Sequence, residues 1–307
     1  MIRIHSIARQ PSLQKKSEIL LAAVIIARST SLIFSRIALG SFGTFNLLAL
    51  RFGAAFILLA AIFARRLFAI KAKELLAGVL LGVLFTAVLT LELFGLKRTD
   101  SGTTSFIENS AMIFVPVFQM IIFRKKPSGP NCIRIALALS GIGILTLGQS
   151  GGLFRSGSIY LIGAALCYAA VIMATAGFSK KYDPLLLGIT QVGTVGILSF
   201  VLSLIFESPR LPESGREWLM ILALAVVCSG FGFTLQPLAQ RGTTAERAGM
   251  MCAVSPVSAA ALGIIFLHEQ ISPYKAAGCA LIMLSLIAEP LIKRVTYLHK
   301  RSVKKLV

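Results

Sequence analysis

Two matching stretches, GTTSFIENSAMIFVP at residues 102–116 and GTTAERAGMMCAVSP at residues 242–256, decide the fold of this chain. They align without gaps, and we call the shift from position 102 to position 242 the repeat offset. Each places Gly-Thr-Thr at the head of an apolar run and a proline about two-thirds of the way along it. The match indicates an internal repeat, with one copy in each half of the chain.

The residues around these stretches have the composition of a protein that crosses a membrane many times. Hydrophobic residues make up 56% of the chain and charged residues only 14%, and the mean hydropathy is +0.84. A soluble domain has about 25% charged residues. A membrane-spanning helix needs about 20 apolar residues, and the chain has ten such runs. These predicted spans are 18–39, 44–64, 74–95, 101–123, 131–149, 157–178, 184–206, 217–239, 243–267 and 273–292.

Ten spans and an internal repeat together predict the fold class. Five spans per half is an odd number, so the second copy must enter the membrane inverted, as in many secondary transporters. We therefore predict an all-α integral membrane protein with ten transmembrane helices, arranged as two inverted five-helix repeats. The predicted divisions are a basic N-terminus (1–17), a first repeat (18–149), a second repeat (157–292) and a basic tail (293–307).

The basic residues predict the orientation of the chain. Of the 31 Lys and Arg residues, 22 fall on the side of the two termini, 7 on the opposite side, and Arg28 and Arg51 within spans. Because cytoplasmic loops carry an excess of Lys and Arg, both termini are predicted to be cytoplasmic. The first apolar run is too long for a signal peptide and is interpreted as a retained span. A bacterial inner membrane is the expected location.

The composition also argues against several other classes of protein. A net charge of +19 can mean nucleic-acid binding, but the basic residues lie between apolar runs and lack interleaved aromatic residues. The five cysteines have no CxxC spacing, and the three histidines flank the spans, so no metal or other cofactor is predicted. No nucleophile–base arrangement and no GxxxxGK[ST] motif is found. We therefore expect neither an enzyme nor an ATP-driven pump.

Four charged residues fall within the spans or close to their ends: Arg28, Arg51, Glu92 and Glu108. A charge in the middle of a membrane costs about 3 kcal/mol or more, so these side chains should face protein or a water-filled cavity. Arg51 and Glu108 have equal predicted depth, and we expect an ion pair, which could serve structure alone. Glu92 is near the outer end of its span and is expected to reach the membrane surface.

Arg28 is predicted to lie near the midplane without an acidic partner. Inverted-repeat carriers bind substrate at that depth. We therefore predict that Arg28 lines a central cavity and binds the negative group of a substrate, with Ser31 on the same helix. The alternative is that Arg28 pairs with backbone carbonyls or with an acidic residue whose depth is misassigned here. The second repeat offers Tyr168, Gln191 and Gln236 as polar candidates, and the repeat offset places Gln191 at the position of Arg51.

Pro116 and Pro256 are the matched prolines of the two stretches. Each removes one backbone hydrogen bond and permits a kink in its helix. Interrupted spans at corresponding positions of two repeats point to a central binding site. The two prolines are therefore candidate hinges, although kinks that serve packing alone would give the same pattern.

Several stretches resemble the drug/metabolite transporter superfamily, in its ten-helix EamA-type branch. The similarity is carried by Arg51-Phe52 and by SPVSAAALGIIFLHEQISPYKAAGCALIMLSLI at 255–287. The chain departs from the family at Ala27-Arg28-Ser29, where the family often has Trp-Gly, and at Arg124-Lys125-Lys126, where Gly-Glu is usual. The resemblance implies a small-molecule carrier, and the family includes exporters of amino acids and of drugs as well as uptake and exchange carriers.

The sequence thus predicts a secondary transporter that moves a small polar metabolite, an amino acid or a related anionic or zwitterionic compound, by alternating access. The expected substrate-binding residues are Arg28, Ser31, Arg51, Glu108, Tyr168 and Gln191. The partners are the small-molecule substrate and the lipid bilayer, with no nucleic acid. A proton or counter-substrate as coupling partner, and a monomer or a homodimer, are left open. The alternatives are an exporter of amphipathic drugs and a non-transporting membrane scaffold.

Overall fold

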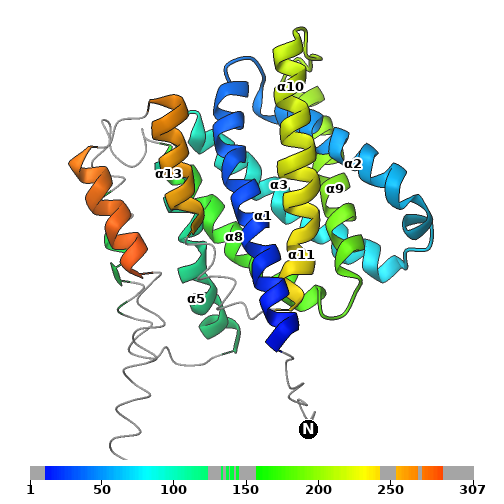
Figure 1. Ribbon diagram of the computed structural model, residues 1–307, viewed down its shortest axis with the longest axis horizontal. Helices are drawn as coiled ribbons and strands as arrows, with labels where there is room; N and C mark the ends of the chain where they lie inside the picture. Colours follow the sequence, from blue (N-terminus) through cyan, green and yellow to red (C-terminus); the bar gives the residue numbers. More distant parts are fainter. Residues whose placement is uncertain are drawn as a thin grey trace, which may run out of the picture.

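The computed structural model consists of helices that stand side by side (Figure 1). It describes residues 11–123, 157–242, 254–268 and 272–285, together with a few positions between 133 and 144. All regular elements in this part are helices. Most of the predicted fifth span, most of the second quoted stretch, residues 124–126, the first ten residues and the basic tail lie outside the described residues.

The first repeat contributes five described helices. They are α1 (Pro11–Ala38), α2 (Thr44–Phe68), α3 (Ala72–Leu96), α4 (Ser101–Asn109) and α5 (Ala111–Phe123). The second repeat contributes α8 (Ser158–Phe178), α9 (Pro184–Phe206), α10 (Gly215–Ala223), the π-helix η1 (Leu224–Phe233), α11 (Thr234–Arg241) and α13 (Val254–Leu267), followed by helical residues 273–285. In this part of the chain, six helical stretches are long and apolar enough to cross a membrane. The all-helical, two-repeat membrane architecture is confirmed, and these helices are consistent with ten spans.

The fourth predicted span is interrupted, but not at its proline. α4 ends at Asn109, and the amide of Ser110 donates to the carbonyls of Phe106 and Ile107. The Ser110 hydroxyl also donates to the Ile107 carbonyl at 2.5 Å, so one side chain closes the turn. Pro116 lies further along, inside α5. Whether Pro116 or Pro256, which lies inside α13, acts as a hinge stays a prediction.

The eighth span carries an irregularity that the sequence analysis missed. α10, η1 and α11 follow one another without a break, and the ten residues of η1 form a wide π-helix. Pro237 stands in the first turn of α11 and has no N–H to donate to the Phe233 carbonyl one turn earlier. π-helical turns are often found at functional sites. Phe233, the last residue of η1, lines the cavity described below.

The two repeats begin with the same hairpin. α1 ends at Ala38 and α2 begins at Thr44; α8 ends at Phe178 and α9 begins at Pro184. Both pairs of boundaries are related by the repeat offset of the quoted stretches. The offset therefore relates positions in three dimensions as well as in sequence.

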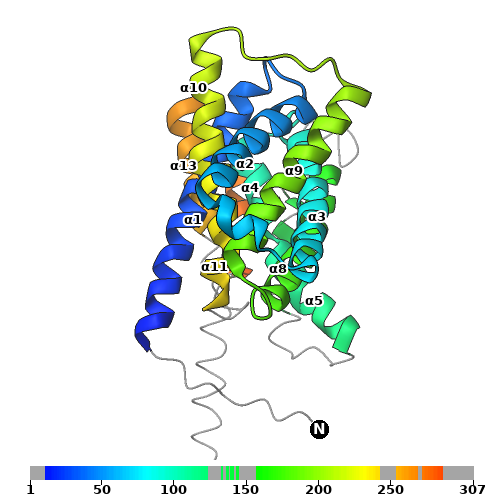
Figure 2. The ribbon, with the colours of Figure 1, turned by 90° about the vertical axis from the view of Figure 1, so that its right-hand side faces the viewer.

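The contacts between turns show that the second hairpin is inverted. At one end of the molecule, Arg210, in the α9–α10 connection, donates to the Ser41 carbonyl in the α1–α2 turn. At the other end, the amide of Asp183, in the α8–α9 turn, donates to Glu74 of α3. We call these the Ser41 end and the Glu74 end. α1 thus finishes at the Ser41 end and α8 at the Glu74 end, and Figure 2 shows the α8–α9 turn at the bottom with the α9–α10 connection across the top.

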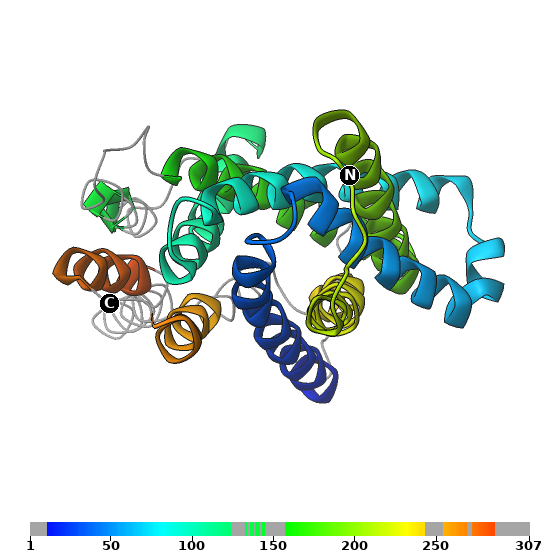
Figure 3. The same cartoon turned by 90° about the horizontal axis from the view of Figure 1, so that it is seen from above.

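Packing between the repeats follows the same approximate two-fold relation. α1 packs against η1, α11 and α13 of the second repeat, while α8 packs against α3, α4 and α5 of the first. α2 and α9, which are counterparts, pack against each other. Figure 3 shows α1 (dark blue) between the eighth span (yellow) and α13 (orange). The core is shared by both repeats, so each depends on the other for its burial.

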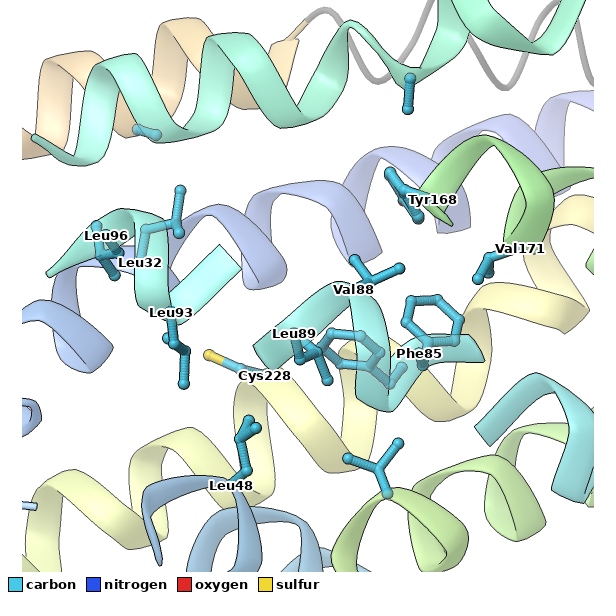
Figure 4. Packing of buried hydrophobic residues seen from close by; sticks show 14 of the residues in the cluster. Leu32, Leu48, Phe85, Val88, Leu89, Leu93, Leu96, Tyr168, Val171 and Cys228 are labelled. Atoms are coloured by element: carbon cyan, nitrogen blue, oxygen red, sulfur yellow. The ribbon is translucent and has the colours of Figure 1, made fainter. Parts of the chain in front are cut away.

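Apolar side chains fill the space between these helices. Figure 4 shows Phe85, Leu89 and Leu93 of α3 facing the interior beside Leu48 and Cys228 from neighbouring helices. All five are almost completely buried. The polar site lies beside this cluster, where α1, α4, α8 and η1 approach α3.

Candidate functional site

A small charged cavity lies between the two repeats. It is lined by residues of α1, α2, α3, α4, α8, η1 and α13. The space open to the centres of water molecules is about 30 Å³, which is room for roughly two waters. Its charged and polar lining includes Arg28, Arg51, Glu92, Glu108, Asn109 and Tyr168. The cavity is therefore small.

Arg28 lies at the centre of this cavity, bonded to both repeats. Its Nη1 donates to the Tyr168 hydroxyl at 2.6 Å and to Oε1 of Gln236 at 2.9 Å. Its Nη2 lies 3.9 Å from Oε1 of Glu108. Tyr168 is related to Arg28 by the repeat offset. The two residues are therefore counterparts in the two repeats, and they contact each other where the repeats meet. The prediction that Arg28 has no acidic partner is wrong. It depended on the predicted ion pair between Arg51 and Glu108, whereas Glu108 pairs with Arg28.

Aromatic rings and a glycine hold the Arg28 side chain in place. The guanidinium carbon lies 4.4 Å from the ring centre of Phe233 and 5.9 Å from that of Phe85, distances typical of cation–π contacts. A Cβ atom on Gly232 would stand 2.9 Å from Cγ of Arg28. The absence of a side chain at Gly232 therefore leaves the room that the arginine stem occupies.

Arg51 does not form the predicted ion pair with Glu108. It is 1% exposed, and its Nη1 donates to Ser31 at 3.0 Å and to Ser35 at 2.9 Å, both on α1. α4, which carries Glu108, packs on α1, α8 and α13, whereas α2 packs mainly on α9 and η1. Arg51 and Glu108 were predicted at the same depth, but α1 lies between their helices. Arg28 of α1 contacts Glu108, and Ser31 and Ser35 of α1 accept from Arg51.

Glu92 does not reach the membrane surface as predicted. It is 6% exposed and lines the cavity from α3. The position of Glu92 near the end of α3 predicted exposure to water, but neighbouring helices cover this end of α3. Arg36 is one of the covering contacts, since its Nη1 donates to the Leu96 carbonyl at the end of α3.

Five of the six predicted substrate-binding residues line this cavity, and Gln191 does not. Gln191 is 1% exposed within α9, and within the described residues neither its Nε2 nor its Oε1 has a hydrogen-bond partner. Sequence reasoning missed Asn109, Phe233 and Ser255 as lining residues. Asn109 could have been found, because it directly follows Glu108. Phe233 and Ser255 could not, because aromatic and small residues are too common in spans to mark a site.

A comparison with protein families explains the duplicated architecture. The model of the EamA-like transporter family matches this chain twice, at residues 15–147 and 155–288. The two matches together cover most of the chain. The chain belongs to the EamA-like transporter family.

Curated relatives of this family member are also transporters. An uncharacterized transporter of Archaeoglobus fulgidus is 23% identical over 71% of this chain and 70% of its own length. The uncharacterized transporter YwfM of Bacillus subtilis is 24% identical, and the threonine/homoserine exporter RhtA of Escherichia coli is 25% identical. The chain spans only 60% and 55% of these two relatives.

A solved crystal structure shares the fold. It has 18% sequence identity and a TM-score of 0.68, over 92% of this chain and 99% of its own. The family and the named relatives are transporters and not enzymes. This EamA-like chain is thus a multi-pass membrane transporter, whose partners are a small-molecule substrate and membrane lipid.

Proposed function

We propose that this chain is a secondary carrier for a small polar metabolite with a negative group, an amino acid or a related anionic or zwitterionic compound. The observation that carries the proposal is the pair of arginines, Arg28 and Arg51, which line one buried cavity between the repeats. Two buried cations in a membrane protein are costly to maintain and are typical of a substrate pathway. A guanidinium group binds a carboxylate through two parallel hydrogen bonds, which favours an acid as the ligand.

The arrangement of the repeats supports alternating access as the mechanism. Every element that lines the cavity belongs to an interface between the two halves, and Arg28 is bonded to Tyr168 and Gln236 of the second repeat. Rocking one repeat against the other would break and remake these bonds while opening the cavity to one side at a time. The name of RhtA, an exporter of threonine and homoserine, agrees with an amino-acid substrate.

The orientation and location form part of the proposal. The excess of Lys and Arg on the side of the termini supports a cytoplasmic N-terminus and C-terminus. The Glu74 end would then face the cytoplasm and the Ser41 end the opposite side. A bacterial inner membrane agrees with the bacterial relatives YwfM and RhtA.

Counterflow in proteoliposomes tests the function directly. Vesicles preloaded with unlabelled compound would be offered labelled L-threonine, L-homoserine, other amino acids, carboxylic acids and amines. We expect saturable counterflow of an amino acid or a related acid by the wild type. Arg28→Gln should lose at least about tenfold, because it removes one of the two positive charges that the cavity offers to an acid and leaves Glu108 without its ion-pair partner.

Arg65→Gln is the matched control, since Arg65 is exposed near the end of α2. It removes the same charge without touching the cavity and should transport like the wild type. Transport of no compound in the panel by the wild type would refute the proposal. Undiminished transport by a folded Arg28→Gln variant would remove Arg28 from the binding site.

A further inference from the structure

Of the four charged residues in the cavity, two already satisfy each other. Arg28 and Glu108 lie 3.9 Å apart. Arg51 and Glu92 remain. Arg51 has serine hydroxyls but no carboxylate within ion-pair distance in the described part of the chain, and its Nε lacks a hydrogen-bond partner there. One cation and one anion of the cavity, Arg51 and Glu92, thus have no partner at ion-pair distance among the described residues.

Glu92 is the less satisfied of these two residues. Its side chain is more than nine-tenths buried, and it has neither an ion pair nor a hydrogen bond with any residue that the structure describes. An ionised carboxylate in such a place costs several kcal/mol unless it meets a cation with hydrogen-bond donors. Glu92 nevertheless lines the space where a ligand would enter.

We propose that Glu92 is the binding site for the ammonium group of the substrate, so that the cavity selects compounds with an amine and a carboxylate over those with one alone. The proposal rests on the proposed function. The substrate's carboxylate would meet the guanidinium of Arg51, and its ammonium the carboxylate of Glu92. A zwitterion supplies one charge of each sign, and Arg51 and Glu92 are the two cavity charges without a partner at ion-pair distance among the described residues.

The chemistry around Glu92 favours an ammonium group over other cations. An ammonium group is compact and carries three donors, which suits a small cavity. A metal ion would need several more ligands, and among the described residues no group of three or more His, Cys, Asp or Glu side chains could hold one. Asn109 and Ser255 line the same cavity and offer neutral oxygen acceptors for the remaining donors.

The test compares L-threonine with the matching 2-hydroxy acid, in which a hydroxyl replaces the amine, and with threoninol, which lacks the carboxylate. Counterflow of each would be measured in proteoliposomes. We expect the wild type to prefer L-threonine over both analogues by at least about tenfold, since a charged group left without its partner strongly disfavours the analogue.

Glu92→Gln should abolish the preference for L-threonine over the hydroxy acid, and Glu92→Asp should restore most of it. Glu213→Gln is the matched control, because Glu213 is exposed in the α9–α10 connection. It should keep the full preference. Thermal unfolding of each purified variant shows whether it is folded.

The outcomes separate the two proposals. If the wild type carries the hydroxy acid as fast as L-threonine, the proposed function stands and the role of Glu92 is refuted. If folded Glu92→Gln keeps the wild-type preference, the role of Glu92 is refuted as well. If the wild type carries none of these compounds, nor any other amino acid, both proposals fall.

Discussion

The α1–α2 hairpin and the α8–α9 hairpin have the same boundaries but different bonds. In the first, Arg51 of α2 donates to Ser31 and Ser35 of α1. At the repeat offset, the corresponding positions of the second hairpin are Gln191, Val171 and Thr175. The structure gives neither the Gln191 amide nor the Thr175 hydroxyl a hydrogen-bond partner among the residues it describes. One hairpin is bonded across its helices, and its counterpart has the groups for such a bond but does not make it.

We interpret this difference in terms of the alternating access proposed above, in which the two halves would differ in conformation. In carriers with inverted repeats, the halves exchange conformations as the protein changes from one open side to the other. The unsatisfied pair in the second hairpin would then be bonded in the opposite state, when the first hairpin loosens. We expect a hydrogen bond between Gln191 and Thr175 there.

The largest expected effects come from replacing Arg51 and Gln191 with leucine. Arg51→Leu deletes the bonds to α1 and leaves the buried hydroxyls of Ser31 and Ser35 without their donor, at a cost of about 1–3 kcal/mol each, so it should destabilise the protein and abolish transport. Gln191→Leu removes two unsatisfied buried polar atoms and should stabilise this conformation by about 1–3 kcal/mol. Because the opposite state loses its bond, transport should slow. Thermal unfolding in detergent and counterflow measure both effects.

Thr175→Val is the companion to Gln191→Leu. It should also slow transport, and the double variant should be no slower than the slower single variant, because both remove the same bond. A Gln191→Leu variant that unfolds more easily than the wild type, or that transports normally, would contradict an exchange of bonds between the hairpins.

A glycine in each repeat provides the next comparison. A Cβ atom on Gly188 of α9 would lie 2.1 Å from the carbonyl oxygen of Thr234, whereas one on Gly53 of α2 would have no atom within 4 Å. Gly188→Ala should therefore separate α9 from α11 and cost about 1–3 kcal/mol. Gly53→Ala should be neutral or stabilise its helix by up to about 1 kcal/mol. Thermal unfolding of the two variants should move in opposite directions, and equal shifts would show that α9 and α11 do not need this close approach.

The smallest expected effect is at the Ser41 end, where the Lys275 ammonium lies 2.8 Å from a carboxylate oxygen of Asp100. Partial burial opposes ionisation, but the Lys275 contact and the hydrogen bonds from Thr103 outweigh it and lower the pKa of Asp100 below its usual 3.8. A lowered pKa means that ionised Asp100 stabilises the fold above about pH 4 and that this contribution is lost as the pH falls through the lowered pKa.

Asp100→Asn should lower stability at pH 7 by about 1 kcal/mol, through the ion pair and the cap of α4. It should also remove this contribution to the acid dependence. Melting temperatures of wild type and variant between pH 7 and pH 3 would converge at the acid end. Curves that stay parallel would mean that Asp100 does not titrate as a partner of Lys275.

The spans and repeats could be predicted from sequence because their signals are local. The length of an apolar run decides whether it crosses the membrane, and α2, α3, α8 and α9 begin and end within a few residues of the predicted spans. Interruptions were harder to predict. The break of the fourth span at Ser110 depends on a hydroxyl that bonds its own backbone, and many serines in spans do not end a helix. The π-helix before Pro237 could not be predicted from hydropathy, because its residues are as apolar as those of an ordinary span.

Several members of the site could be predicted from sequence, but not their pairing. Charged residues in apolar runs pointed to Arg28, Arg51 and Glu108. The repeat offset pointed to Gln191, which does not line the cavity, whereas Glu92, Asn109, Phe233 and Ser255 line it without having been predicted to. Depth alone assigned Glu108 to Arg51 and placed Glu92 at the surface. Both assignments failed because they depend on how each helix is rotated about its axis.

The sequence by itself determined that this chain crosses the membrane, that its halves are repeats and that charges are buried among its spans. The spans and the buried charges follow from transfer free energies that each residue contributes whatever its neighbours are, and the repeat follows from the matching residues of the two halves. Only the tertiary structure decided that Arg28 meets Tyr168, Gln236 and Glu108, that Arg51 is held by α1, that Glu92 lines the cavity, and that the Gln191 amide has no hydrogen-bond partner among the described residues. Partner choice depends on helix rotation and on which helix lies between two others, and both are set by packing between residues far apart in the chain.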